Sequence, residues 1–92
     1  MQIDSIRHKT LRRLAVTGDR RIMEADRLID VLAFISAAHS FNDLATPPNF
    51  GLHPLKGDRA GRFAMTVTKN WRMTFLKIDD QTVADLDLED YH

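Results

Sequence analysis

The last three residues of the sequence, Asp90, Tyr91 and His92, bring a carboxylate, a phenol and an imidazole together. Their ordinary pKa values are about 4, 10 and 6.5, so around neutral pH His92 is the one that readily gives and takes a proton. Asp90 could orient that imidazole or bias its charge, and Tyr91 could stack on a base or assist proton transfer. Alone, such a tail is typical of a frayed chain end. As a group, these residue types predict acid–base chemistry.

A second group of candidates lies in a basic segment. Residues 56–77 contain six bases and one acid, and hence a local charge of +5, whereas residues 79–90 contain six acids and no base. The formal net charge of zero is therefore the sum of two opposed segments. A basic segment of this density predicts contact with phosphate. The candidate phosphate-binding residues are Lys56, Arg59, Arg62 and Arg72.

The elements that must position these side chains follow from hydrophobic periodicity. Apolar residues at helical spacing predict helices over 9–16 and 23–39, with Gly18 just past the first. Period-two alternation predicts strands over 62–68 and from 82 onward, and a high content of β-forming residues predicts one over 71–78. Residues 2–7, with Ile3 and Ile6 among polar residues, are consistent with a short edge strand. Residues 40–44 resemble a capped helical turn, and 49–58 read as a loop. We expect an α+β fold in one domain, residues 1–92, with an N-terminal strand and two helices packed on an antiparallel sheet.

The helices should cover the sheet face that carries Met73 and Phe75. Alternation then places Arg72 and Thr74 on the other face, which is left partly open for function. Trp71 is expected in the core rather than as a platform for a base. The acids from Asp85 to Asp90 have a plain alternative role, which is to keep a sheet edge soluble.

Composition excludes several classes of protein. The chain has no cysteine, so a disulfide framework and thiolate chemistry are excluded. The longest apolar run, residues 31–38, is far shorter than a membrane span, and no signal peptide is visible. A cytoplasmic location is the default. No histidine pair has metal-ligand spacing, and we expect neither a metal nor a cofactor.

Three segments together resemble a known family. Residues 52–63 (LHPLKGDRAGRF), 70–75 (NWRMTF) and 87–92 (DLEDYH) occur in this order and at matching spacing in the HigB branch of the RelE/ParE toxin superfamily, also called plasmid maintenance system killer proteins. The resemblance extends over essentially the whole chain. It implies a compact microbial-RNase-like fold and a toxin that enters the ribosomal A site, cuts mRNA without a metal and inhibits translation.

The same resemblance implies roles for individual residues and partners. His53 in the HPLKG segment, with Asp90, Tyr91 and His92, matches the family's catalytic set, and Lys56 and Arg72 match its phosphate-binding positions. The partners implied are the 70S ribosome with its mRNA and a helix-turn-helix, HigA-like antitoxin that holds the toxin inactive. Operator DNA would be contacted indirectly, through that antitoxin.

Two other readings stay open at this point. One is a ParE-type gyrase poison, which binds and cuts no RNA. The terminal Asp90, Tyr91 and His92 argue against it, because a binder has no need for clustered acid–base groups. The other is a degenerate toxin that acts only as an antitoxin-binding co-regulator, which the net charge of zero slightly favours.

Overall fold

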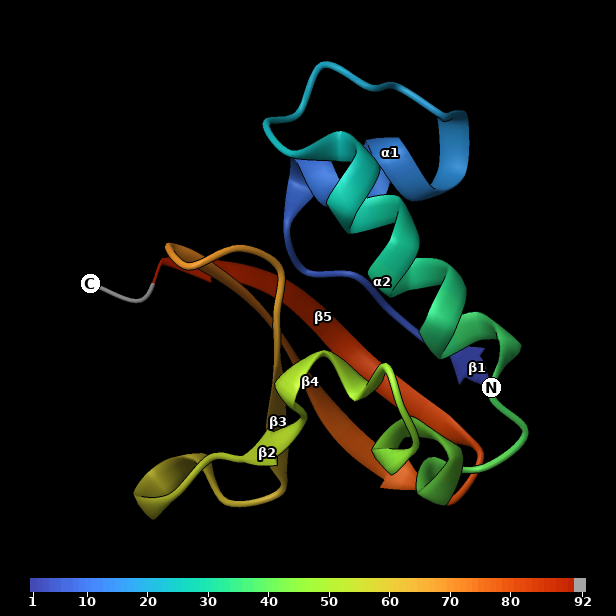
Figure 1. The fold of residues 1–92 in the computed structure, drawn as a ribbon, viewed down its shortest axis with the longest axis vertical. Helices are drawn as coiled ribbons and strands as arrows, with labels where there is room; N and C mark the ends of the chain where they lie inside the picture. Colours follow the sequence, from blue (N-terminus) through green and yellow to red (C-terminus); the bar gives the residue numbers. More distant parts are fainter. Residues whose placement is uncertain (91–92) are drawn as a thin grey trace.

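The computed structural model describes residues 1–90, and Figure 1 shows two helices set against one sheet. Three short 3₁₀ helices, η1 to η3, lie between the helical and the C-terminal parts of the chain. In chain order the elements are β1 (Gln2–Ile3), α1 (Lys9–Thr17), α2 (Ala25–Ala37), η1 (Phe41–Ala45), η2 (Asn49–Gly51), β2 (His53–Pro54), η3 (Gly57–Arg59), β3 (Arg62–Thr66), β4 (Trp71–Asp79) and β5 (Thr82–Asp90).

The sheet has five strands in the order β1-β5-β4-β3-β2. Strands β2 to β5 pair antiparallel, but β1 pairs parallel with β5, with Gln2 opposite Thr82. The expected α+β class is confirmed, whereas the expected antiparallel sheet is in fact mixed. The parallel pair arises because both helices lie between β1 and the remaining strands, so the chain crosses over before it returns to the sheet.

Local sequence explains how α1 begins and ends. His8 precedes the helix, and its Nδ1 accepts a hydrogen bond from the backbone N–H of Leu11 (3.2 Å). At the other end Gly18 adopts a left-handed conformation (φ 74°) and donates its N–H to the carbonyl of Leu14 (3.1 Å). The predicted stop at Gly18 is confirmed, because glycine adopts this conformation without strain. Helix α2 is two residues shorter than predicted at each end.

The core lies between the helices and one face of the sheet. From α2 the buried residues are Leu28, Val31, Leu32 and Ile35, and from β3, its following turn and β4 they are Met65, Val67, Met73 and Phe75. The prediction that the helices cover this face is confirmed. Burying a side chain of this size contributes about 1.5–3 kcal/mol.

Two local expectations are wrong. Ser40 makes no side-chain cap at the start of η1, and Asp43 instead accepts from the backbone N–H of His39 (2.9 Å). The expected loop over 49–58 contains β2, which pairs with β3 and adds a strand to the sheet. Backbone pairing of two residues, His53 and Pro54, leaves too short a pattern to detect in the sequence. Within residues 1–90, no helix has the length and apolar character to cross a membrane.

Candidate active site

A row of cross-strand partners crosses the sheet on the face opposite the helices. It consists of His53, Ala64, Thr74 and Asp87, one residue from each of β2 to β5. Cross-strand partners project to the same face. With neighbouring strands about 4.8 Å apart, the backbones of His53 and Asp87 are about 14 Å apart. His53 therefore belongs to the open face, where Arg72 and Thr74 were predicted to lie.

His53 is exposed and has a defined orientation. Its Nδ1 lies 2.9 Å from the carbonyl oxygen of Gly51. A carbonyl only accepts, so Nδ1 carries the proton in this contact, and Nε2 of the neutral ring holds the lone pair. The backbone beyond it is held by a hydrogen bond from Leu55 N–H to Arg62 O (2.8 Å). Lys56, three residues after His53, is exposed.

The carboxylate of Glu89 is the centre of a cluster on the same face. It accepts from Arg59 at both oxygens (Nη1–Oε1 2.9 Å, Nη2–Oε2 2.5 Å) and from Thr74 Oγ1 at Oε2 (2.6 Å). Arg72 Nη2 lies 3.4 Å from Oε1. The hydrogen bonds from Arg59 lower the pKa of Glu89 to about 2, with help from Thr74 and Arg72 and against the opposing effect of burial. The same bond raises the pKa of Arg59.

A second carboxylate of β5, Asp85, is shared by two arginines. Arg62 contacts Asp85 twice: Nη1 donates to the carboxylate Oδ2 (3.0 Å) and Nη2 donates to the backbone carbonyl of Asp85 (3.0 Å). Arg7 Nη2 lies 3.2 Å from the same Oδ2. Each arginine predicted to bind phosphate thus contacts an acid of β5. Sequence reasoning treated the basic and acidic segments as opposed patches and missed that antiparallel pairing brings them together. The sequence signal that could have predicted these contacts is the alternating position of the acids along β5, which puts them on one face of the strand.

Asp90 ends β5 and pairs with Trp71. Leu88, two residues earlier, pairs with Met73 and packs against the core, so alternation puts Asp90 on the helix side of the sheet. His53 and Asp90 therefore start from opposite faces of the sheet. Tyr91 and His92, the other two predicted catalytic residues, lie outside the described residues.

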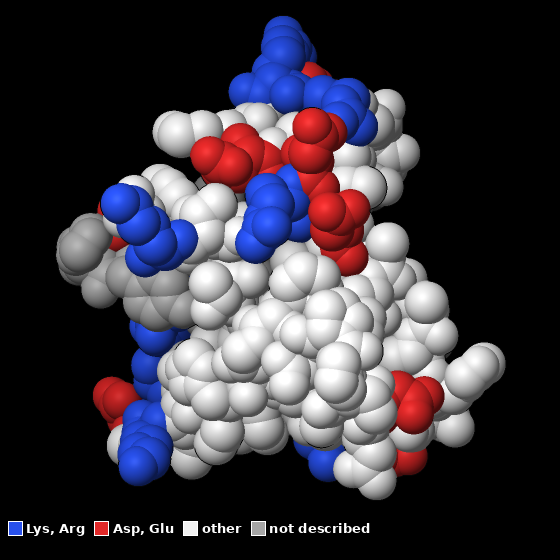
Figure 2. Space-filling model, viewed as in Figure 1, with Lys and Arg blue, Asp and Glu red and all other residues white. Residues whose placement is uncertain are grey.

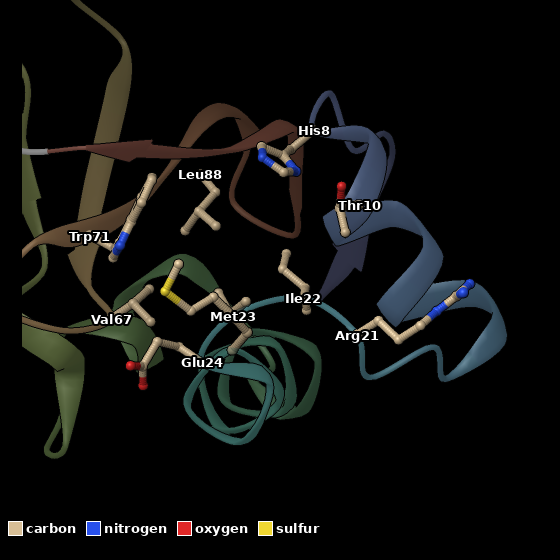
Figure 3. Close-up of a pocket in the computed structure, with 10 residues that line it drawn as sticks. His8, Thr10, Arg21, Ile22, Met23, Glu24, Val67, Trp71 and Leu88 are labelled. Atoms are coloured by element: carbon tan, nitrogen blue, oxygen red, sulfur yellow. The ribbon is translucent and has the colours of Figure 1, made fainter.

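A cavity of about 280 Å³ lies on the helix side, near the end of β5. Figure 3 shows Leu88, Val67 and Met23 forming its apolar part, with Trp71 and His8 at its sides. Trp71 is half-buried and packs against the core, as predicted, but it also lines this cavity. The open-face residues around Glu89 do not line it.

Positive charge outside the ion pairs described above lies on α1. Lys9, Arg12 and Arg13 are exposed, and no ion pair joins them to an acid within residues 1–90. Figure 2 shows Lys and Arg side chains gathered at the end of the molecule formed by α1 and the α1–α2 connection. In the described part of the chain, no three His, Asp or Glu side chains group closely enough to hold a metal.

Comparisons with known proteins agree with this fold. The chain is 40% identical to the protein named Endoribonuclease HigB from Proteus vulgaris over 93 residues, which cover 98% of this chain and 99% of that protein. The structure is similar to that of a YoeB/ParE toxin from Agrobacterium tumefaciens, with a TM-score of 0.54 at 18% identity over 97% of this chain and 99% of the other. At that identity the second match supports the fold alone.

A family model described as the RelE-like toxin of type II toxin–antitoxin system HigB matches residues 4–92. That match covers nearly the whole chain, and it includes all three segments on which the resemblance rests. The chain belongs to the HigB-like family of type II toxin–antitoxin toxins.

Proposed function

We propose that this toxin, an endoribonuclease, cuts mRNA in the ribosomal A site. The ribose 2′-OH would attack the adjacent phosphate, expel the 5′-oxygen and leave a 2′,3′-cyclic phosphate. This reaction needs a base, an acid and positive charge near the phosphorane-like transition state. The observation that carries the proposal is the orientation of His53, whose exposed ring holds Nδ1 against the carbonyl of Gly51 and turns Nε2 away from it.

In this proposal His53 accepts the proton of the 2′-OH, and His92 donates a proton to the 5′-oxygen. A positioned acid or base typically contributes 10²- to 10⁴-fold in rate, so loss of either imidazole should be severe. Asp90 would orient His92 or favour its protonated form, and Tyr91 would stack on a splayed base.

Lys56 and Arg72 would neutralise charge on the phosphate, and Arg59 and Arg62 would support them through their contacts with Glu89 and Asp85 rather than through the RNA. Lys56 is well suited to this role because it is exposed and follows His53 by three residues. Arg72 also contacts Glu89, so its guanidinium would be held in place rather than mobile. Preorganised donors of this kind are each worth about 2.7–4 kcal/mol in other enzymes.

A type II toxin has an antitoxin as its partner. We propose that this partner is a HigA-like helix-turn-helix protein, through which the toxin contacts operator DNA. The ribosome is the second proposed partner, and it places the toxin in the cytoplasm. The exposed cations of α1 support ribosome binding, because they lie outside the site and suit a phosphate backbone.

The test programs purified ribosomes with a defined mRNA, adds the chain and maps new 5′ ends by primer extension. We expect cuts within A-site codons that need the ribosome and disappear with His53→Gln and with His92→Gln. His39→Gln is the matched control, since His39 is also exposed but lies beyond the end of α2. Growth arrest without a cut at any codon would refute the nuclease proposal and favour gyrase as the target.

A further inference from the structure

We propose that Glu89 is a positioning residue for the nuclease reaction. Its carboxylate fastens the loop that carries His53 and Lys56 to the strand that ends in Asp90. The inference rests on the proposed function, because those residues are the proposed catalytic and phosphate-binding groups. Glu89 itself need not touch the RNA.

The contacts connect two distant parts of the chain. Arg59 ends η3, three residues after Lys56, and Glu89 immediately precedes Asp90. In the sheet order, β4 and β3 separate β5 from β2, so the contact joins the segment after β2 to a strand that is not its neighbour in the sheet. Each guanidinium Nη atom donates to one of the two carboxylate oxygens. This paired geometry fixes the orientation of the two side chains as well as their distance.

The rest of the cluster makes the carboxylate a fixed anchor. Thr74 is fully buried, and its hydroxyl donates to Glu89 at 2.6 Å. Ala64, which shares the row of Thr74, is also fully buried on this face. Glu89 retains 22% exposure of its side chain and Arg59 36%, so the loop end of the contact is the more open one. The anchor is therefore on β5, and the loop is the part that is held.

The backbone hydrogen bonds of this loop within residues 1–90 join it to β3. The loop pairs with β3 through His53 and Pro54, and Leu55 bonds to Arg62. These contacts position the loop relative to β3. The Arg59–Glu89 pair then sets the distance between the loop and the end of β5. A misplacement of about 1 Å between reacting groups can cost about 100-fold in rate. Loss of Glu89 should therefore reduce kcat more than it changes KM.

The kinetic test uses Glu89→Gln, Arg59→Gln and the double variant in the ribosome-programmed cleavage assay. We expect each single variant to lose about 10- to 100-fold in kcat, with KM for programmed ribosomes changed less than about twofold. The double variant should be no worse than the poorer single one, because both changes remove the same contact. Losses that multiply would mean that Arg59 acts on the RNA independently, and would overturn the proposal.

Asp19→Asn is the matched control. Asp19 also accepts from an arginine at both oxygens, with Arg21 Nε at 2.9 Å and Nη2 at 2.7 Å, and Arg21 lowers its pKa to about 2. It lies in the α1–α2 connection, away from β2 and η3. We expect Asp19→Asn to cleave like the unaltered toxin. Equal activity of Glu89→Gln and Asp19→Asn would overturn the proposal.

A second measurement separates this inference from the proposed function. Backbone hydrogen exchange reports the loop directly, whether or not the chain cuts RNA. We expect faster exchange over residues 55–60 in Glu89→Gln and in Arg59→Lys, with β4 unchanged. Arg59→Lys keeps the charge but loses the fork of donors, and it provides the test if Glu89→Gln does not fold. Unchanged exchange in the loop would overturn the positioning role even if mRNA is cut.

Discussion

The carboxylate of Glu89 accepts two hydrogen bonds from the guanidinium of Arg59, although the residues are 30 positions apart in the chain. On the open face of the sheet, the pair connects η3 to the end of β5. Its charges cancel locally, so the basic segment of the sequence is not a free basic surface in the folded protein. This pair affects stability as well as the proposed reaction.

Stability should depend on pH through Glu89. Its folded pKa is about 2 against an ordinary value of 4.5, so in that range the unfolded chain binds more protons. The resulting stabilisation is fully present above about pH 4.5, and it is lost as the pH falls towards 2. We expect the difference in free energy of unfolding between the unaltered chain and Glu89→Gln to shrink over this range. Urea denaturation from pH 6 to pH 2.5 measures it, and a difference that stays constant would contradict the assignment.

Two isoleucines, one in the core and one on the surface, form a matched pair for a stability test. Ile35 on α2 is fully buried, whereas the side chain of Ile78 on β4 is 53% exposed. Ile35→Ala should cost about 2–5 kcal/mol, because it leaves a cavity between helix and sheet. Ile78→Ala should change the free energy of unfolding by less than about 0.5 kcal/mol. Denaturation of both variants at pH 7 checks this, and similar values for the two would mean that α2 does not pack on the sheet as described.

Much of the fold could be predicted because its signals are local. Helical spacing around Leu11 and Leu14, the glycine at 18 and the alternation along β3 to β5 depend on neighbours in sequence. The parallel pairing of β1 with β5 depends on residues about 80 positions apart, and no local pattern encodes it. The left-handed backbone of Asp85 (φ 59°) was equally invisible, since it arises where β5 is irregular beside β4.

The candidate site divides in the same way. His53 and Asp90 were predicted as site residues because their residue types and motifs carry chemistry. Asp85 and Glu89, the other acids of interest on β5, were given only the plain role of protecting a sheet edge. In the structure β5 lies between β1 and β4 along its first half, and Asp85 and Glu89 bind the arginines that were assigned to phosphate. That role follows from strand pairing, which the order of residues alone does not reveal.

Lys56 should matter to catalysis more than to folding. Its side chain is exposed three residues after His53, so its removal leaves no buried cavity. We expect Lys56→Gln to lower kcat about 10- to 100-fold through lost stabilisation of charge on the phosphate. The melting temperature should stay within about 2 °C. Lys69→Gln, an exposed lysine between β3 and β4, is the control, and equal cleavage by both variants would remove Lys56 from the proposed site.

The cations of α1 should govern attraction to the ribosome rather than cleavage. Lys9, Arg12 and Arg13 project from one helix, and the helix has no acid in its first turn. If they meet RNA phosphates, replacing all three by Gln should flatten the plot of log affinity against log salt by about two to three units of slope. Cleavage positions and kcat at saturating ribosomes should not change, because the open face is untouched.

Binding of the toxin to ribosomes at several salt concentrations measures this slope. The double variant Arg12→Lys with Arg13→Lys keeps the charge, and we expect it to keep most of the slope, since a phosphate backbone is attracted by charge more than by a guanidinium fork. An unchanged slope in the triple Gln variant would place ribosome contact elsewhere. A slope that falls equally in the Lys variant would indicate bidentate contacts and not general attraction. The nuclease proposal would stand in both cases, because it depends on His53 and the end of β5 and not on the cations of α1.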